Sequence, residues 1–341
     1  MRRIKVKVRN GYVVMVGRDL LKDCGKFIQT GDTRIKKIFL VSETNVAPLY
    51  LEKTKKSLED VGFEVVEYVY EAGEKSKNLS EIANMLGLLA ENGFTRTDAV
   101  VALGGGVTTD MAGFAASIYL RGIKVYQIAT TLLAQVDASV GGKTGVDLKE
   151  GKNLVGAFHQ PSLVICDVDL LKSLSNEVFA EGMAEVIKYA FISDKDLYEK
   201  LRTKIDKNSP ELEDVVARCV ELKAYVVEQD ELDNGLRQTL NFGHTLGHAI
   251  ERNSNFTVSH GYAVAKGMAM ISRHSPIYNE LVEMIKLYDL PYEDDSTFED
   301  LLGGIMNDKK KRGSKITVVL VNEIGKAELK TIEPSELKGY L

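Results

Sequence analysis

Three of the chain's five histidines lie close together in the sequence and could bind a metal ion. His244 and His248 stand four residues apart in GHTLGHAIE, and His260 follows twelve residues after His248. Residues with a spacing of four share one face of a helix. Two imidazoles and one carboxylate leave a zinc ion with open positions, as catalytic zinc requires. The segment therefore predicts a catalytic metal site; the alternative is an exposed or capped histidine pair without a metal.

The carboxylate of such a site has two candidates on one predicted helix. Glu185 opens EVIK and is followed three residues later by Lys188, while Glu181 lies one helical turn earlier. A Glu-x-x-Lys pair is usually a solvated ion pair. The spacing alone does not decide between the two glutamates.

A glycine run, GGGVTTD at 104–110, follows a strand-like segment and opens a helix-like one. Glycines let the backbone approach a pyrophosphate, and the free N–H groups of a helix start favour its negative charge. A second polar cluster, TTLLAQVDASVGGKTG at 130–145, follows the next predicted strand. Because ligands of doubly wound sheets gather at the carboxyl ends of the strands, we expect a nucleotide there. The spacing is not GxGxxG, and a tight turn without a ligand is the alternative.

Amines and amides recur near both motifs. The residues are Lys143, Lys152, Asn153, Lys223, Arg237, Asn241 and Lys309. A lone lysine is normally solvated, and the lysine run at 309–311 has the weakest case. In an acidic protein, however, amines around a metal and a nucleotide indicate an anionic substrate with phosphate and carboxylate groups.

The elements that must position these residues change character along the chain. Strand-like segments at 37–43, 63–73, 98–106 and 124–131 alternate with helix-like ones, which predicts a largely parallel, doubly wound sheet. From about residue 170 the sequence is mainly helical, apart from a hairpin at 315–332. We expect a Rossmann-like nucleotide-binding α/β domain over residues 1–170 and a mainly α-helical metal- and substrate-binding domain over 171–341.

The composition limits the possible partners and compartments. The 341 residues carry a formal net charge of −5, so no global basic field attracts nucleic acid or an acidic membrane. No apolar run approaches the roughly 18 residues of a membrane span. We expect the N-terminal segment to form a strand pair with Asn10-Gly11 at the turn, and not a signal peptide, because no apolar run follows its arginines. Three isolated cysteines indicate neither a disulfide framework nor a thiolate site, so we expect a cytoplasmic location.

Taken together, the motifs resemble those of the 3-dehydroquinate synthase family of sugar phosphate cyclases. The similar segments are ALGGGVTTDMAGFAAS, ATTLLAQVDASVGGKTGVDL, GKNLVGAFHQP, GMAEVIKYA, CVELKAYVV, LRQTLNFGHTLGHAIE and HGYAVAKGM, in the family's order and spacing. They cover most of residues 98–270, and NDKK near 307 extends the match.

The resemblance implies a role for each matching residue. Glu185, His244 and His260 match the zinc ligands, which Co²⁺ could also use. Positions that hold NAD match Glu74, Lys77, Gly105, Gly106, Asp110, Thr130 and Thr131, with Lys143 and Lys152 close to both cofactor and substrate. Substrate-site positions match Asp137, Lys143, Lys152, Asn153, Lys188, Lys223, Arg237, Asn241, His248 and Lys309. In the family the residue matching Arg121 reaches across a homodimer to the neighbouring site.

The implied reaction converts 3-deoxy-D-arabino-heptulosonate 7-phosphate into 3-dehydroquinate and phosphate, a step of the shikimate route to aromatic amino acids. NAD oxidises a ring hydroxyl transiently, phosphate leaves by β-elimination, hydride returns and an intramolecular aldol closes the carbocycle. His248 is the candidate proton shuttle, because imidazole titrates near neutral pH. The sequence departs from the family pattern at Glu43, Asp233, Tyr262 and a shortened segment at 272–284.

Three other readings stay open at this point. One is another sugar phosphate cyclase, forming a valiolone- or inosose-type ring from a substrate without the carboxylate. The second is a metal-dependent glycerol or alcohol dehydrogenase, which would not need the GGK and GKN phosphate cluster. The third is an inactive NAD-binding regulator, against which the intact set of ligands argues.

Overall fold

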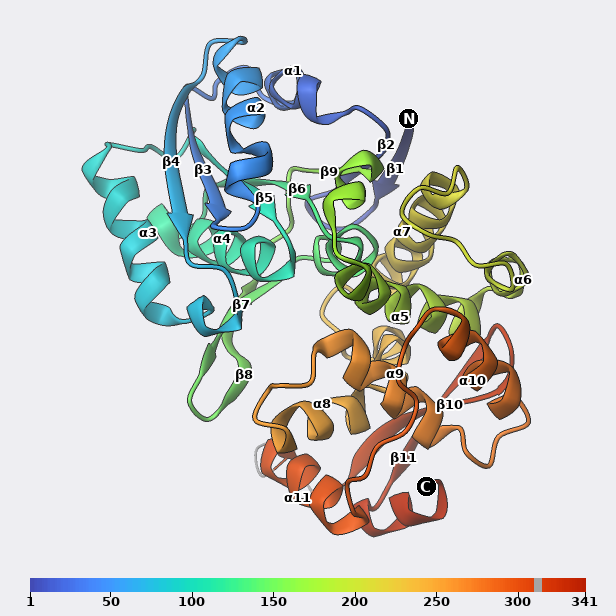
Figure 1. Cartoon of the computed structure of the whole chain (residues 1–341). Coiled ribbons are helices and arrows are strands. Elements are labelled where there is room, and N and C mark those ends of the chain that lie inside the picture. Colours follow the sequence, from blue (N-terminus) through green and yellow to red (C-terminus); the bar gives the residue numbers. More distant parts are fainter. Residues whose placement is uncertain (310–314) are drawn as a thin grey trace. The chain divides into compact units, whose positions relative to one another are not determined.

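The computed structural model of the chain describes residues 1–309 and 315–341 (Figure 1). Its contacts form two compact units. Unit 1 comprises Met1–Leu174 and Lys223–Glu228, and unit 2 comprises Ser175–Leu222 and Gln229–Leu341.

Unit 1 is built on a seven-stranded sheet of order β1-β2-β9-β6-β5-β3-β4. The strands are β1 (Arg2–Val6), β2 (Tyr12–Gly17), β3 (Lys37–Glu43), β4 (Glu64–Tyr70), β5 (Ala99–Gly104), β6 (Lys124–Ala129) and β9 (Leu163–Asp167). Only β1 and β2 pair antiparallel; the other neighbours are parallel. The expected doubly wound α/β architecture is confirmed.

Both faces of this sheet are covered by helices, which explains why its strands are almost continuously apolar. The helices are α1 (Cys24–Gly31), α2 (Ala47–Glu59), α3 (Leu79–Glu91) and α4 (Gly106–Ile118). Ile38 and Leu40 belong to the core that includes residues of α1 and α2, whereas Phe39 and Val41 belong to the core that includes residues of α3 and α4. Alternate residues of one strand thus bury opposite faces.

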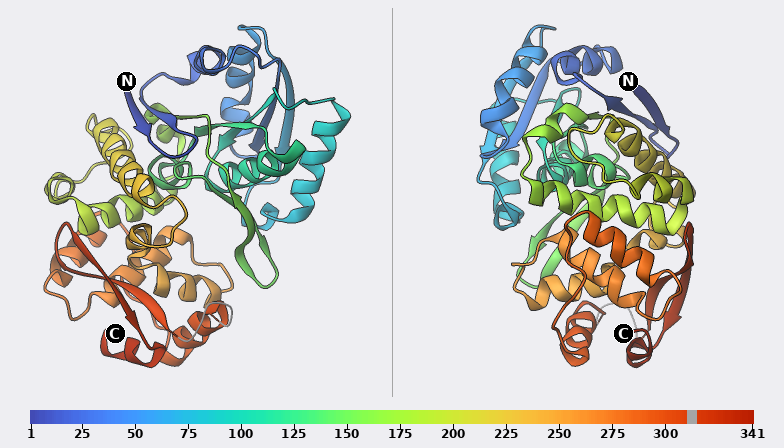
Figure 2. Two further views of the ribbon diagram at one scale, coloured as in Figure 1. Left: turned by 180° about the vertical axis from the view of Figure 1, so that it is seen from behind. Right: turned by 45° about the vertical axis from the view of Figure 1, so that its right-hand side comes forward.

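A second hairpin, β7 (Lys143–Leu148) with β8 (Gly151–Phe158), extends from unit 1 and is visible in green in Figures 1 and 2. The glycine-rich, polar sequence of this stretch does not predict these two strands. Gly145 and Gly156 face each other in the register. A Cβ on Gly145 would lie 2.6 Å from the Val155 carbonyl oxygen, and one on Gly156 would lie 2.1 Å from the Thr144 carbonyl oxygen. These glycines therefore allow close strand pairing.

Unit 2 is mainly helical, as expected. It contains α5 (Asn176–Ser193), α6 (Lys195–Leu201), α8 (His244–Asn253), α9 (His260–Ile271), α10 (Tyr278–Leu287), α11 (Phe298–Lys309) and most of α7 (Leu212–Gln229). The predicted C-terminal hairpin is confirmed as β10 (Ile316–Glu323) and β11 (Lys326–Ile332). Among the described residues, no helix is long and apolar enough to cross a membrane.

Candidate active site

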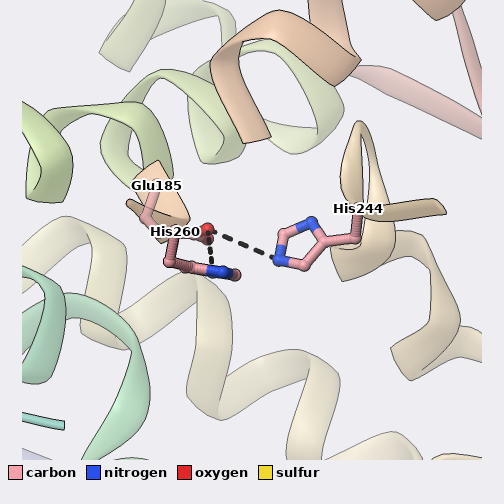
Figure 3. A group of neighbouring side chains, drawn as sticks. All are labelled: Glu185, His244 and His260. Carbon is pink, nitrogen blue, oxygen red and sulfur yellow. Dashed lines mark ion pairs between the residues drawn. The ribbon is translucent and has the colours of Figure 1, made fainter. Parts of the chain in front are cut away.

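Three helices of unit 2 bring Glu185, His244 and His260 together (Figure 3). Glu185 lies in the middle of α5 and is fully buried, while His244 and His260 are the first residues of α8 and α9. The Nε2 atom of His244 is 3.5 Å from Glu185 Oε1, and that of His260 is 3.6 Å from the same oxygen. One ligand atom of each residue lies within 4.8 Å of the others. This is the spacing that a single cation bridging the three side chains requires.

Close helix packing makes this convergence possible. A Cβ on Gly261 would lie 2.3 Å from the carbonyl oxygen of Glu181 on α5, and one on Gly267 would lie 2.1 Å from that of Gly243. Gly247 of α8 similarly faces the Ala263 carbonyl at 3.1 Å. Because side chains at these positions would separate the helices, the glycines in HGYAVAKGM and FGHTLGH place α9 against α5 and α8.

The Nδ1 atom of each imidazole also lies near an oxygen atom. His244 Nδ1 is 3.1 Å from the carbonyl oxygen of Phe242, and His260 Nδ1 is 3.5 Å from Oε2 of Glu251. With Nδ1 next to these oxygen atoms, the Nε2 atom of each ring lies on the side of Glu185. The Lys188 ammonium pairs with Oε2 of Glu185, so both carboxylate oxygens lie among nitrogen atoms.

Burial and charge set the protonation of the two imidazoles. Burial lowers the pKa of His244 to about 3, so this ring is neutral at pH 7 and can donate a lone pair. Burial also opposes the charged form of His260, but hydrogen bonding to Glu185 and Glu251 outweighs it and raises the pKa of His260 to about 10. A divalent cation would take the place of that proton. Two imidazole nitrogens and a carboxylate oxygen are a donor set that Zn²⁺ and Co²⁺ both accept.

Two further acidic residues lie near this cluster. Glu181, the rival carboxylate on α5, is absent from the groups of potential metal ligands found among the described residues. Glu251 was not singled out in the sequence, although it is only 2% exposed and its carboxylate lies within 4.8 Å of ring nitrogens of His248 and His260. Its spacing of three from His248 and seven from His244 was the available signal, because these positions share one helix face.

In unit 1, five predicted residues form a second polar cluster. Lys77 Nζ donates to Asp110 Oδ2 at 2.7 Å and to Asn153 Oδ1 at 2.6 Å, and Lys152 Nζ is 3.7 Å from Glu74 Oε1. Burial would lower the pKa of Lys77, but the carboxylates of Asp110 and Glu74 raise it above its ordinary value. The Lys77 ammonium is therefore a buried positive charge held by carboxylates.

Asp147 of β7 closes this cluster and was not predicted as a site residue. Its backbone N–H donates to the Lys77 carbonyl at 2.9 Å, and its Oδ1 accepts the backbone N–H of Asn153 at 2.7 Å. Asn153 adopts a left-handed φ of 53°, which Asn tolerates better than most residues. The network connects the hairpin β7–β8 to the turn at Glu74–Ser76.

The glycine turn lies at the carboxyl end of β5, next to that of β6. Gly105 precedes α4 and Gly106 is its first residue. Gly104 pairs with Ala129, and its carbonyl accepts the N–H of Thr130 at 3.0 Å. A Cβ on Gly105 would lie 3.0 Å from Cγ2 of Thr131. The two polar clusters predicted after consecutive strands thus lie side by side.

The remaining candidates occupy several places. Lys223 Nζ donates to Asp137 Oδ1 at 2.7 Å within unit 1, and Lys143 is exposed at the start of β7. Arg237 of unit 2 is buried and donates to the Glu231 carbonyl at 2.7 Å. Asn241 ends the turn Leu236–Asn241. His248 is exposed on α8, with its ring centroid 5.5 Å from that of His244. Arg121 is exposed and has a φ of 68°. The side chain of Lys309, and Lys310 and Lys311, lie outside the described residues.

Two protein-family models together match most of the chain. A model described as 3-dehydroquinate synthase N-terminal matches residues 67–181, and one described as 3-dehydroquinate synthase C-terminal matches residues 182–311. A 3-dehydroquinate synthase of Lactococcus lactis subsp. cremoris (strain MG1363) is 43% identical over 344 residues, covering 97% of this chain and 96% of that protein.

Solved structures share the fold over nearly the whole chain. The 2-epi-5-epi-valiolone synthase from Streptomyces hygroscopicus subsp. jinggangensis 5008, solved with NAD⁺ and Zn²⁺ bound, has a TM-score of 0.87 at 25% identity and covers 99% of this chain and 98% of its own. A 2-deoxy-scyllo-inosose synthase complexed with carbaglucose-6-phosphate, NAD⁺ and Co²⁺ has a TM-score of 0.86 at 23% identity, with 99% of each chain covered.

Proposed function

Since the chain belongs to the 3-dehydroquinate synthase family, we propose that it converts 3-deoxy-D-arabino-heptulosonate 7-phosphate into 3-dehydroquinate and phosphate. The enzyme is then a phosphate-eliminating carbon–oxygen lyase of the shikimate route to aromatic amino acids. The observation that carries this proposal is the convergence of His244 Nε2 and His260 Nε2 on Oε1 of Glu185. A cyclisation that proceeds through a transient ketone needs such an electrophilic centre.

The cofactors are assigned to different units. Glu185, His244 and His260 would hold Zn²⁺, with Co²⁺ as a substitute, and the glycine turn with Glu74, Lys77, Asp110, Thr130 and Thr131 would hold NAD. When bound, NAD would supply the hydride acceptor and donor, and the metal would supply polarisation of the reacting oxygen. The start of α4 presents backbone N–H groups suited to the pyrophosphate. The valiolone synthase, at 25% identity, was solved with both NAD⁺ and Zn²⁺, which supports this pairing.

The chain's own side chains bind and orient the substrate. Lys143, Lys152 and Asn153 are suited to the phosphate, because ammonium and amide N–H groups donate to its oxygens. Lys223, Arg237 and Asn241 are suited to the carboxylate, with Asp137 holding the Lys223 ammonium and Lys309 as a further cation. Most of the rate enhancement then comes from positioning and charge compensation.

Proton transfer is assigned to the histidine helix. His248 is exposed on α8, with its ring centroid 5.5 Å from that of His244 and 6.1 Å from that of His260. An exposed imidazole one helical turn from a metal ligand can take a proton near the polarised oxygen and exchange it with water. Lys188, paired with Glu185, orients the carboxylate that would bind the metal.

The other activities considered, a different sugar phosphate cyclase and a dehydrogenase, are less well supported. The chain is 43% identical to the Lactococcus lactis dehydroquinate synthase and 25% identical to the valiolone synthase. A substrate without a carboxylate would also leave Arg237, which is 2% exposed, without that anionic partner. A glycerol or alcohol dehydrogenase would not need the phosphate-directed lysines.

The assembly is proposed to be a homodimer in the cytoplasm. All three cysteines are free and buried, which suits a reducing compartment. Leu120 and Arg121 both have left-handed φ values, 48° and 68°, and Ile118 and Leu120 are 43% and 40% exposed. Strained backbone beside exposed apolar side chains is consistent with a contact surface. If Arg121 serves the partner's site, mixing inactive Arg121→Ala and His260→Ala proteins restores part of the activity; mixtures without activity contradict that role.

One assay tests the reaction directly. The purified protein is supplied with Zn²⁺, NAD and the heptulosonate phosphate, and released phosphate, carbocyclic product and NADH are followed together. Stoichiometric phosphate and product without lasting NADH are expected. Net NADH formed from a simple alcohol, or no phosphate release, would contradict the proposal.

A further inference from the structure

Glu251 is a buried carboxylate that none of the steps above uses. It lies on α8, is 2% exposed, and its Oε2 atom is 3.5 Å from Nδ1 of His260. Burying a carboxylate is costly unless a charged or hydrogen-bonding partner compensates it. Its position beside a candidate metal ligand therefore calls for an explanation in terms of that ligand.

The two candidate imidazole ligands differ in how they are held. His244 is 12% exposed at its side chain, and its Nδ1 contacts the Phe242 carbonyl two residues earlier in the chain. The side chain of His260 is 30% exposed, so packing restrains it less. The neighbour at its Nδ1 comes from another helix, α8.

We propose that Glu251 is a positioning residue for the metal site. Its carboxylate accepts the Nδ1–H of His260, which selects the tautomer with its lone pair on Nε2 and turns that atom toward Glu185 Oε1. A carboxylate on the outer nitrogen also makes the imidazole a stronger donor. This inference rests on the proposed function, because it assumes that Glu185, His244 and His260 bind a metal.

The geometry argues against Glu251 as a direct ligand of the same ion. Glu251 lies on the Nδ1 side of His260, whereas Glu185 lies 3.6 Å from Nε2. The two nitrogens of one imidazole point in different directions and cannot bind one cation together. His248, Glu251 and His260 could instead form a second cation site, and the metal stoichiometry distinguishes that outcome.

The test measures metal binding separately from turnover. The Zn²⁺ affinity of the metal-free full chain is measured by competition with a chromophoric chelator for wild type, Glu251→Ala and Glu251→Gln. The Co²⁺ absorption spectrum reports the ligand geometry. Asp194→Asn is the matched control, because Asp194 is also a buried carboxylate of unit 2 but pairs with Arg218 and caps α6.

Glu251→Ala is expected to lose roughly 10- to 100-fold in Zn²⁺ affinity and to alter the Co²⁺ spectrum. Glu251→Gln should recover part of the affinity, because an amide oxygen still accepts the Nδ1–H. Asp194→Asn should bind metal as wild type does, whatever its thermal stability. A purely structural role of Glu251 would change thermal stability without changing the spectrum.

Wild-type affinity and spectrum in Glu251→Ala would overturn the proposal, as would equal damage from Gln and Ala. A second equivalent of metal that Glu251→Ala abolishes would also overturn it, in favour of a ligand role. If Glu251→Ala does not fold, Glu251→Asp decides: it keeps the charge but draws the carboxylate one methylene away from Nδ1. A weaker affinity then supports the proposal and a wild-type affinity rejects it. Wild type without any metal binding would instead reject the proposed function.

Discussion

Two groups of side chains differ in how their charges are paired. They are the histidine cluster of unit 2 (Glu185, His244 and His260) and the Lys77 cluster of unit 1 (Lys77, Asp110, Asn153 and Asp147). In unit 2, long helices hold two imidazole nitrogens 3.5 and 3.6 Å from one carboxylate oxygen, an arrangement that a cation between them would complete. In unit 1, a turn, the start of α4 and a hairpin bring Lys77, Asp110, Asn153 and Asp147 into a network of hydrogen bonds of 2.6–2.9 Å. We propose that the first cluster binds an ion, whereas the hydrogen bonds of the second fix the positions of its own side chains. Mutations should therefore remove a ligand in one unit and disturb geometry in the other.

The largest effect is expected from the metal ligands. Glu185→Ala or His260→Ala should lose the metal and lower kcat by at least about 10³-fold, because polarisation by the metal contributes several kcal/mol and each 1.4 kcal/mol is tenfold in rate. Metal content, turnover and circular dichroism are measured on the same samples. Glu181→Gln is the matched control on α5 and should retain the metal. Normal turnover with stoichiometric metal in either ligand variant would refute the assignment.

The second largest effect is expected at the buried ion pair between Lys77 and Asp110 in unit 1. The side chains of Lys77 and Asp110 are 5% and 20% exposed, and removing one partner of a buried pair costs roughly 3–5 kcal/mol. Lys77→Ala should lower the free energy of unfolding by about this amount and weaken NAD binding, without changing metal affinity. Denaturant unfolding and NAD titration measure both quantities. Lys22→Ala removes an exposed ion pair of the same unit and should change neither the free energy of unfolding nor the NAD affinity. Comparable losses in the two variants would show that burial of the Lys77–Asp110 pair does not cause the effect.

A third prediction concerns pH and metal binding. The pKa of His260 is raised from 6.5 to about 10 in the metal-free chain, so the ring keeps its proton until the pH exceeds this value. Metal must displace that proton, and the apparent affinity should rise about tenfold per pH unit between roughly pH 7 and 9. The stabilising contribution of this proton is present below 6.5 and lost as the pH rises toward 10. Calorimetry in buffers of different ionisation enthalpy counts the released protons; a pH-independent affinity would contradict this protonation state.

The smallest effect is expected at the hairpin. Asp147→Asn replaces the carboxylate that accepts the Asn153 N–H with a neutral amide. A hydrogen bond to a charged group contributes about 1.5–3 kcal/mol, and the variant should lose part of this. KM for NAD or substrate should rise roughly tenfold with metal content unchanged. Burial is the main cause that raises the pKa of Asp147 to about 6, so the wild type should approach the variant's behaviour as the pH falls below this value. Measuring KM of both proteins from pH 5 to 8 tests this. Loss of metal in Asp147→Asn would contradict the expectation that the Lys77 cluster and the metal site are independent.

Much of the fold could be predicted from local patterns. The alternation of strands and helices in residues 37–131, the helical second half and the C-terminal hairpin depend on hydrophobic period and on glycine stops, which are properties of neighbouring residues. The hairpin β7–β8 escaped prediction because its glycines resemble a phosphate-binding turn. In the structure these glycines face the carbonyls of the paired strand. Likewise, α7 reads as one helix but contributes Lys223–Glu228 to unit 1, which no local feature indicated.

The sequence by itself determined the types and order of the reactive residues, and with them the family, because motifs such as GGGVTTD and GHTLGHAIE are contiguous. Only the tertiary structure decided which of them meet. It placed Glu185 and not Glu181 in the group with the two histidines, as the family resemblance implies but the spacing does not. It also placed Glu251 beside Nδ1 of His260 and joined Lys77 to Asp110 and Asn153. The physical reason is that these contacts join residues on different helices, strands or turns. Their distances depend on how closely helices and strands pack, which spacing along a sequence does not encode.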